Sequence, residues 1–422
     1  MFNHRIVMWS GVLIITILIG GLLWWYLFIQ KQTTNIRVES DARGFSSESP
    51  VFSGTGGSMR ENISSLFQDA FGLSPVERAT STDSAPLPRL FRASSIPSTG
   101  LSSFLIAGTS DDEFRFIERP SGNILAVPLA GGSVRRITNT LIPQVYDALW
   151  INKTSVLIRH SNDGGITLLS FLGTIQKATS SETSALVGTY LEDNIVSAAA
   201  RPNGNEPALF YLAKTDDGVV GILVNSDGKK PRRLWSSPLS GWNVYWISDD
   251  TIVLSQKAAE GIIGSAYTIS VKTGTLSLLV GNKDGLSVRR HPTKNAILYS
   301  ASLNGSLKLY ARVDGVVIGL PLATFAEKCV WAQGKDLRAY CAAPNSLPGV
   351  PLPDAWYRGE VSFTDQWFTV DPIAGTATLL INLVQERGSG SYIDVLNPSI
   401  DASGKRLFFV DKTTGTPWVL TI

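Results

Sequence analysis

The two cysteines are the residues whose spacing points most directly to chemistry. Both lie in the stretch EKCVWAQGKDLRAYCAAP, which is expected to form a β-hairpin whose turn centres on Lys335. Cys329 and Cys341 would then lie directly opposite each other. Opposed residues in an antiparallel pair have Cα atoms about 4.5–5.5 Å apart, within the range of about 4.4–6.8 Å that a disulfide accepts. We therefore predict a Cys329–Cys341 disulfide, with two buried neighbouring thiols as the alternative.

Other reactive groups do not form recognisable sites. An oxidised cysteine pair would place the domain in an oxidising compartment outside the cytoplasm. Two cysteines without a nearby histidine are too few ligands for a metal ion, so no metal site is expected. The histidines, His4, His160 and His291, form no H-E-x-x-H pair, and the chain has no G-x-S-x-G motif. We predict no cofactor and no catalytic residue.

A strand-and-turn unit that recurs along the chain must position any functional residue. Its clearest copy covers residues 198–235, where the turns Asp217-Gly218 and Asp227-Gly228 separate runs of alternating apolar residues. Asp-Gly between such runs is a strong hairpin signal. This copy is therefore predicted to contain four antiparallel strands.

Related copies follow the same order in four further stretches. They span residues 146–174, 242–280, 286–315 and 328–381. We expect a glycine in the turn between the third and fourth strands of each copy, and these are Gly173, Gly228, Gly274, Gly315 and Gly375. A four-stranded unit that recurs every ~40–50 residues has the period of a β-propeller blade. The alternative architecture is a pair of β-sandwiches.

The recurring unit resembles the TolB-like propeller repeat, which is a WD40-like repeat also called PD40. The resemblance is carried by Arg201-Pro202-Asn203-Gly204, Leu209-Phe210-Tyr211, Ser226-Asp227-Gly228-Lys229 and, in a later copy, His291-Pro292. The Trp-Asp dipeptide of true WD40 repeats does not occur. The resemblance implies an all-β ring in which each blade buries its faces against its neighbours.

Seven copies can be counted between about residue 100 and the last residue, with six as the alternative because residues 100–140 are weakly patterned. The last copy holds only three strands, and an open blade edge exposes unpaired backbone groups. Residues 88–92 read Pro-Arg-Leu-Phe-Arg and resemble residues 231–235, the fourth strand of the clearest copy. We predict a single propeller over residues 87–422, closed by the strand near 88–92.

Aromatic and basic side chains recur at one place in the unit. Trp150, Trp246 and Trp331 end the first strand of their copies, and Arg201 and His291 occupy the corresponding place in two others. First strands line the axis of a propeller, so Arg201, Trp246, His291 and Trp331 are the candidate binding residues. The alternative for the tryptophans is packing between blades.

The N-terminal segment predicts a membrane anchor followed by a tether. Residues 6–29 contain no charged residue and end in aromatic side chains, and a helix of this length spans a hydrocarbon core of about 30 Å. We predict a retained single-pass anchor over residues 1–31, with a cleaved signal peptide as the alternative. Residues 32–86, rich in Ser, Thr, Gly and Pro, are predicted to be a flexible spacer with a short amphipathic helix at 58–73 that docks on a neighbouring domain or binds a partner.

Charge and motifs together favour a binding protein. The formal net charge is +2 without a long basic run, so nucleic-acid binding is not expected. Our first hypothesis is a non-catalytic scaffold, tethered to the cell membrane outside the cytoplasm, that binds a protein or cell-envelope ligand. The alternatives are an enzyme that acts on an envelope glycan or peptide through carboxylates at the channel, and a structural part of a surface assembly. Two or three accessible carboxylates in the channel would favour the enzyme, whereas Ser, Thr and apolar groups would favour binding.

Overall fold

The computed structural model describes residues 89–106, 112–165, 167–177, 183–191, 194–303, 306–387 and 392–422. All of them belong to the compact unit Ser81–Ile422. The predicted anchor at residues 6–29 and the predicted helix at 58–73 lie outside the described residues. Among the residues that are described, no helix is both long and apolar enough to cross a bilayer.

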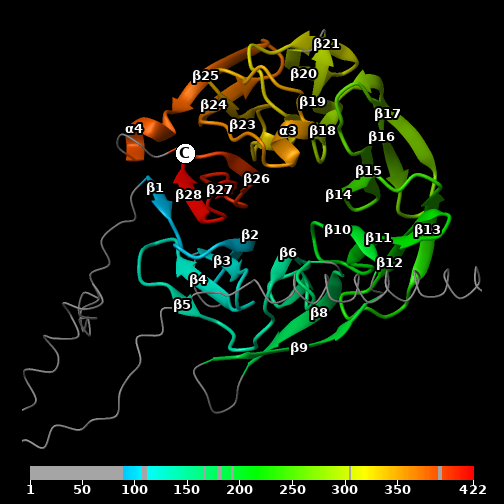
Figure 1. The fold of residues 1–422 in the computed structure, drawn as a ribbon, viewed down its shortest axis with the longest axis vertical. Coiled ribbons are helices and arrows are strands. Elements are labelled where there is room, and N and C mark those ends of the chain that lie inside the picture. The colour runs from blue at the N-terminus through cyan, green and yellow to red at the C-terminus, as the bar shows by residue number, and fades with distance from the viewer. Residues whose placement is uncertain are drawn as a thin grey trace, which may run out of the picture. The chain divides into compact units, whose positions relative to one another are not determined.

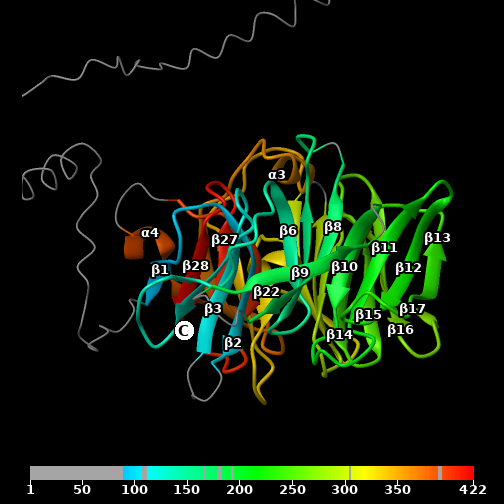
Figure 2. The same ribbon diagram turned by 90° about the horizontal axis from the view of Figure 1, so that it is seen from below.

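Seven antiparallel sheets of four strands each form a ring around a central axis (Figure 1). This arrangement confirms the predicted seven-bladed β-propeller, so the alternatives of six blades and of two β-sandwiches are wrong. In six of the blades the strands are hydrogen-bonded in chain order, with the first strand nearest the axis (Figure 1). Figure 2 shows the ring from the side, with the strands running between its two faces.

The first three blades each contain four consecutive strands. The first blade is made of β2 (Ser98–Leu105), β3 (Asp112–Glu118), β4 (Ile124–Pro128) and β5 (Arg135–Arg136). The second is made of β6 (Val145–Trp150), β7 (Ser155–His160), β8 (Leu169–Gln176) and β9 (Ala185–Tyr190). The third is made of β10 (Ile195–Ala200), β11 (Leu209–Thr215), β12 (Gly218–Val224) and β13 (Arg232–Ser237).

The remaining blades continue around the ring. The fourth is made of β14 (Trp242–Ser248), β15 (Thr251–Gln256), β16 (Ile263–Ser270) and β17 (Leu276–Asp284). The fifth is made of β18 (Ser287–Arg290), β19 (Ala296–Leu303), β20 (Ser306–Val313) and β21 (Val316–Gly319). The sixth is made of β22 (Cys329–Trp331), β23 (Ala339–Pro344), β24 (Asp365–Asp371) and β25 (Thr376–Ile381). Three short helices accompany this part of the chain: η1 (Ala326–Lys328), α3 (Asp354–Tyr357) and α4 (Leu383–Arg387).

The seventh blade combines both ends of the described chain. Counted outward from the axis, its first three strands are β26 (Val395–Ile400), β27 (Arg406–Asp411) and β28 (Pro417–Thr421). Its fourth and outermost strand is β1 (Leu90–Arg92). β1 pairs antiparallel with β28, so that Phe91 lies opposite Val419. The segment near residues 88–92 therefore supplies the fourth strand that the C-terminal residues lack, as its likeness to residues 231–235 predicts.

The apolar core lies in the seams between neighbouring blades. Successive side chains of a strand point to opposite faces of its sheet, so each blade presents an apolar face to the blade before it and another to the blade after it. In the seam between the third and fourth blades, Phe210 and Leu223 pack with Trp242 and Ile252. Clusters of the same kind join every other pair of neighbours around the ring. Each blade therefore depends on both neighbours for its stability.

One predicted turn is wrong. The structure places four of the five expected glycines in turns between the third and fourth strands, all with positive φ: Gly228, Gly274, Gly315 and Gly375. Gly173 instead lies inside β8, directly opposite Gly188 of β9. A Cβ atom at Gly173 would lie 2.7 Å from Cγ of Leu186, so the close approach of β9 requires glycine there. The fourth strand of this blade consequently follows later than the sequence predicts.

A long connection between β23 and β24 departs from the repeat. It carries α3, which lies on one face of the ring near the axis (Figures 1 and 2). Trp356 of α3 is fully buried and packs against Phe325 and Phe363. The half-buried side chain of Leu396 in β26 belongs to the same apolar cluster. The connection is therefore packed onto the inner part of the ring.

Candidate functional site

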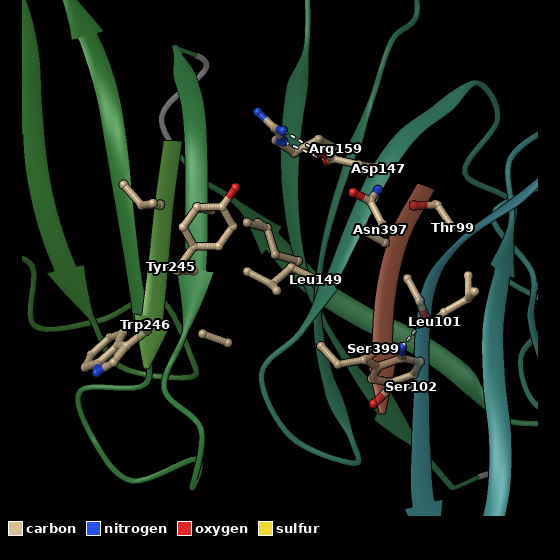
Figure 3. A pocket seen from close by; sticks show the side chains of 18 of the residues that line it. Thr99, Leu101, Ser102, Asp147, Leu149, Arg159, Tyr245, Trp246, Asn397 and Ser399 are labelled. Atoms are coloured by element: carbon tan, nitrogen blue, oxygen red, sulfur yellow. Dashed lines mark hydrogen bonds and ion pairs between the residues drawn. The ribbon is translucent and has the colours of Figure 1, made fainter. Parts of the chain in front are cut away.

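The central channel contains a cavity of about 510 Å³, shown in Figure 3 and called the channel cavity below. Its lining comes mainly from the inner strands β2, β6, β10, β14 and β26. The side chains that Figure 3 labels are Thr99, Leu101, Ser102, Asp147, Leu149, Arg159, Tyr245, Trp246, Asn397 and Ser399. Pockets of about 300–1,000 Å³ are typical of small-ligand sites, so the channel cavity has the size of a binding site.

The two sides of the channel cavity differ in chemistry. β2 and β26 present hydroxyl and amide groups, among them those of Thr99 and Asn397 (Figure 3). Leu149 and Tyr245 lie across from them, and β10 adds three consecutive alanines at residues 198–200 (Figure 3). An alanine has no side chain beyond Cβ, so β10 leaves space open. The channel cavity therefore has one polar wall and one apolar, aromatic wall.

Irregular backbone shapes the polar wall. The pairing of β2 with β3 shifts register between Thr99 and Ser102, and Gly100 in this bulge has φ +60°. A Cβ atom at Gly100 would lie 3.0 Å from Cβ of Ala148 in the next blade, which leaves room only for glycine. β26 has a similar shift after Leu396, where Asn397 has φ 50°. Bulges redirect side chains, and these two turn the polar groups of β2 and β26 toward the cavity.

The carboxylate in the channel cavity forms an ion pair with an arginine. Of the described residues that line the cavity, Asp147 is the one carboxylate. Arg159 lies opposite it on β7, donates from Nε to Oδ1 at 2.7 Å and also contacts Oδ2 through Nη2. Burial lowers the pKa of Arg159, but the hydrogen bond and charge of Asp147 more than offset this and raise it. Arg159 also donates to the backbone oxygen of Ile195 at 3.0 Å, so the ion pair joins the second blade to the third.

A second polar cluster borders the channel cavity at Tyr245. Cζ of Arg289 lies 4.5 Å from the centroid of the Tyr245 ring, and Nη2 of Arg289 donates to the backbone oxygen of Glu327 at 3.3 Å. The hydroxyl of Tyr357 in α3 donates to Oε1 of Glu327 at 2.5 Å. Burial raises the pKa of Glu327, and burial together with the charge of Glu327 raises the pKa of Tyr357. This hydrogen bond fastens α3 to η1 at the edge of the channel.

A buried ion cluster supports the same corner of the ring. Nζ of Lys328 lies 2.6 Å from Oδ2 of Asp365 and 2.6 Å from Oδ1 of Asp394, and all three side chains are buried. Asp394 also accepts hydrogen bonds from the indole of Trp356 at 2.8 Å and from the backbone N–H of Phe363 at 3.1 Å. The cluster therefore fixes the connection that carries α3 to the sixth and seventh blades.

The cluster predicts a pH dependence of stability. Burial raises the pKa of Asp365 from 3.8 to about 6. The folded protein then binds this proton more tightly than the unfolded chain, so the contribution of Asp365 to stability grows as the pH falls through 6 toward 4 and is absent well above pH 6. Relative to Asp365→Asn, the free energy of unfolding of the wild type should rise by about 1.4 kcal/mol between pH 7.5 and pH 5. Urea unfolding at the two pH values measures this, and a constant difference would contradict the raised pKa.

The structure brings the candidate binding residues together in two separate pairs. Cζ of Arg201 lies 5.7 Å from the centroid of the Trp246 ring, and the rings of His291 and Trp331 meet edge-to-face at 5.1 Å. Each pair joins the end of one inner strand to the inner strand of the next blade. Of the four residues, Trp246 lines the channel cavity. A binding role for any of them remains a prediction.

Trp150 and Trp331 each donate a hydrogen bond across a seam between blades. The indole of Trp150 donates to the backbone oxygen of Gly100 at 2.7 Å, and that of Trp331 donates to the backbone oxygen of Arg289 at 3.2 Å. In both cases the acceptor lies in the inner strand of the preceding blade. Both side chains are buried. The packing alternative describes these two contacts, whereas the indole of Trp246 donates to the backbone oxygen of Ser248 in its own blade at 2.8 Å.

Cys329 and Cys341 face each other in the pairing of β22 with β23 and form a disulfide. Both are fully buried in the seam between the fifth and sixth blades. A disulfide that closes a loop of this length contributes about 3 kcal/mol in the chain-entropy account. We expect Cys329→Ala/Cys341→Ala to lower the free energy of unfolding by about this amount. Reduction of the wild type with dithiothreitol should have the same effect, and equal stability of all three forms would contradict it.

Several residues of the site were not singled out from the sequence. Asp147 and Arg159 occupy matching positions of adjacent predicted strands, so an opposite-charge pair across that hairpin was a usable signal. Tyr245 immediately precedes a candidate residue, Trp246, on the same inner strand. Glu327 and Tyr357 carried no signal, because they meet only through a connection that does not repeat.

Comparison with known proteins shows likeness at the level of the fold. No protein-family model matches the chain, and no curated protein sequence matches it significantly. Solved structures that resemble it include the tricorn protease (12% identity, 81% of this chain, TM-score 0.49) and an oligogalacturonate lyase in complex with manganese (11% identity, 78% of this chain and 97% of the lyase, TM-score 0.47). TolB from Acinetobacter baumannii is also similar (12% identity, 76% of this chain and 79% of TolB, TM-score 0.41). The chain spans 34% of the length of the tricorn protease. The similar structures thus include enzymes as well as TolB.

Proposed function

We propose that the protein is a non-catalytic binding protein whose channel cavity takes up part of a protein ligand. The observation that carries this proposal is the lining of the channel cavity. Its described residues offer hydroxyl, amide and apolar groups and one carboxylate, that of Asp147, which is paired with Arg159. A carboxylate held in an ion pair is poorly placed to exchange protons with a substrate. An enzyme acting on an envelope glycan by the usual two-carboxylate route would need a second carboxylate in the cavity at a defined separation.

The form of the inner strands favours an extended protein segment as the ligand. Each inner strand is the edge strand of its sheet, and an edge offers backbone N–H and C=O groups to an added chain. The polar wall near Thr99 and Asn397 can bind backbone or polar side chains, while Leu149 and Tyr245 can cover apolar ones. A loop or chain end with alternating polar and apolar residues fits both walls.

We further propose that this propeller works outside the cytoplasm, held to the cell membrane through residues 6–29. Two features support the location. Residues 6–29 form an uncharged run long enough to span a bilayer. The Cys329–Cys341 disulfide is the kind of bond that persists in oxidising compartments.

Site-specific photo-crosslinking in intact cells tests the proposal. A photoreactive phenylalanine analogue at Tyr245 places the probe in the channel cavity, and the same analogue at Leu278, which is 64% exposed on the outer strand β17, is the matched control. The Tyr245 probe should capture one protein partner that the Leu278 probe does not. Equal capture from both positions would contradict binding in the channel, and capture of cytosolic proteins alone would contradict the proposed location.

A further inference from the structure

A second hollow lies at the seam between the first and second blades, next to the ion pair of Asp147 and Arg159. It has a volume of about 640 Å³, and its walls include Arg119, Pro120, Val145, Tyr146, Ser161 and Leu168. We call it the seam hollow. It is formed by the connection after β3, the start of β6 and the connection after β7. None of the residues proposed above to bind the channel ligand contributes to it.

Arg119 is held firmly at the edge of the seam hollow by its backbone. Its N–H donates to the oxygen of Pro97 at 2.8 Å, and its own oxygen accepts from the N–H of Val145 at 2.9 Å. Its side chain is less well satisfied, because Nε is buried and has no hydrogen-bond partner among the described residues. Burial lowers the pKa of Arg119, and the charge of Asp147 only partly offsets this effect. Arg119 therefore presents a partly desolvated guanidinium from a backbone that is fixed by two hydrogen bonds.

The carboxylates near the seam hollow make their contacts with groups other than Arg119. Asp147, whose charge acts on Arg119, is already paired with Arg159. Asp163 in the neighbouring connection accepts hydrogen bonds from the hydroxyl of Ser161 at 2.7 Å and from the N–H of Thr167 at 2.9 Å. Burial lowers the pKa of His160, so this side chain adds no positive charge near neutral pH. No carboxylate of the described residues forms an ion pair with Arg119, so a carboxylate of a ligand can take that place.

Beside the polar Gln144 and Ser161, the rest of the wall is made of apolar or aromatic side chains and glycines. The side chain of Tyr146 is 55% exposed, and Val145, Pro120 and Leu168 line the same hollow. Gly164 and Gly165 also line it, and a Cβ atom at either position would meet nothing within 4 Å. The centroid of the Tyr146 ring lies 5.6 Å from Cζ of Arg159, so the guanidinium covers one face of the ring. The exposed part of the ring can meet an apolar group.

We infer that the seam hollow binds a carboxylate that carries an adjacent apolar group, with Arg119 as its anchor. A single guanidinium matches the single charge and planar shape of a carboxylate, which it can bind through two parallel hydrogen bonds. A phosphate dianion would call for more than one cation. The apolar wall at Tyr146 and Leu168 then receives the neighbouring group. The C-terminal residue of a peptide and a small aromatic acid share this chemistry.

Two pairs of probes test the inference on the full-length protein by isothermal titration calorimetry. N-acetyl-phenylalanine and N-acetyl-phenylalaninamide differ only in the charge of one group. The acid should bind at least tenfold more tightly than the amide, since a hydrogen bond to a charged group is lost in the amide. 3-Phenylpropionate lacks the acetamido group, so tighter binding of N-acetyl-phenylalanine than of 3-phenylpropionate would indicate a peptide end and the reverse a small acid. Equal affinity for acid and amide would overturn the proposal.

Variants separate the site from general effects of charge. Arg119→Gln should weaken binding of N-acetyl-phenylalanine at least tenfold. Arg136→Gln makes the same change at an exposed arginine of the first blade and should leave binding unaltered. Tyr146→Ala, at an exposed position that should not affect folding, should weaken binding several-fold and keeps the test valid if Arg119→Gln does not fold. Equal affinities of the Arg119→Gln and Arg136→Gln proteins, or of Tyr146→Ala and the wild type, would contradict the assignment.

Discussion

Lys328→Met is expected to lower the free energy of unfolding by about 3–5 kcal/mol, because it leaves Asp365 and Asp394 buried without their cation. Both carboxylates have side chains that are 0% exposed, so water cannot replace the lysine. The aromatic rings around the ammonium deepen the loss, since Nζ lies 4.6 Å from the ring of Phe363 and 4.9 Å from that of Trp356. Urea unfolding followed by tryptophan fluorescence measures the effect.

Two further variants make this result specific. Lys328→Met/Asp365→Asn/Asp394→Asn removes all three charges, and replacing a whole buried ion cluster by neutral groups is often nearly neutral. We therefore expect it to recover most of the lost stability. Lys229→Met, at a lysine whose side chain is 79% exposed, should change stability by less than about 0.5 kcal/mol. A Lys328→Met protein as stable as the Lys229→Met protein would show that the cluster does not support the ring.

Phe91→Pro is expected to open the ring. The alternation of backbone bonds from Arg89 to Ala93 along β28 places the N–H of Phe91 on the bonded side of β1. Proline removes that donor, and the partly buried phenyl ring leaves the seam between the seventh and first blades at the same time. Loss of one hydrogen bond and most of one apolar side chain amounts to about 3 kcal/mol. The edge of β28 then becomes free to pair with another molecule.

Arg92→Pro is the matched control for ring closure. Arg92 is exposed and its N–H faces solvent by the same alternation, so proline there removes no bond to β28. Chemical unfolding together with analytical ultracentrifugation should show a less stable, association-prone Phe91→Pro protein and a near-normal Arg92→Pro protein. Equal behaviour of the two variants would mean that β1 does not close the ring in solution.

The fold could be predicted from the sequence because the residues that indicate each blade lie close together in the chain. Asp227-Gly228 and the glycines at 274, 315 and 375 mark turns whose backbone requires positive φ, and each turn reports one blade. Gly173 was misread because the same residue type serves another purpose there: it makes room for β9, a strand whose position the local sequence does not reveal. Ring closure was predictable because an unpaired edge and a matching strand-like segment stood at opposite ends of the repeat array.

The site was harder to predict from the sequence because the residues in contact there lie far apart in the chain. Arg201 and Trp246 belong to different blades, and only the ring brings them together. In the sequence, Lys328 has the appearance of a surface residue. Its partners are Asp365 of β24 in the sixth blade and Asp394, the residue before β26 in the seventh, and only folding brings them together. The connection that carries α3 has no counterpart in the other blades, so a pattern based on repetition could not place Tyr357.

Filling the channel cavity tests the central claim most directly. Ala198→Trp places a large side chain in a space of about 510 Å³, and Leu278→Trp on the outer strand β17 is its control. The measurement is the dissociation constant for the protein partner captured from the Tyr245 position. We expect a folded Ala198→Trp protein to bind that partner at least a hundredfold more weakly, while the affinity of Leu278→Trp stays at the wild-type value. Undiminished binding by a folded Ala198→Trp protein would contradict a role for the channel cavity in ligand binding.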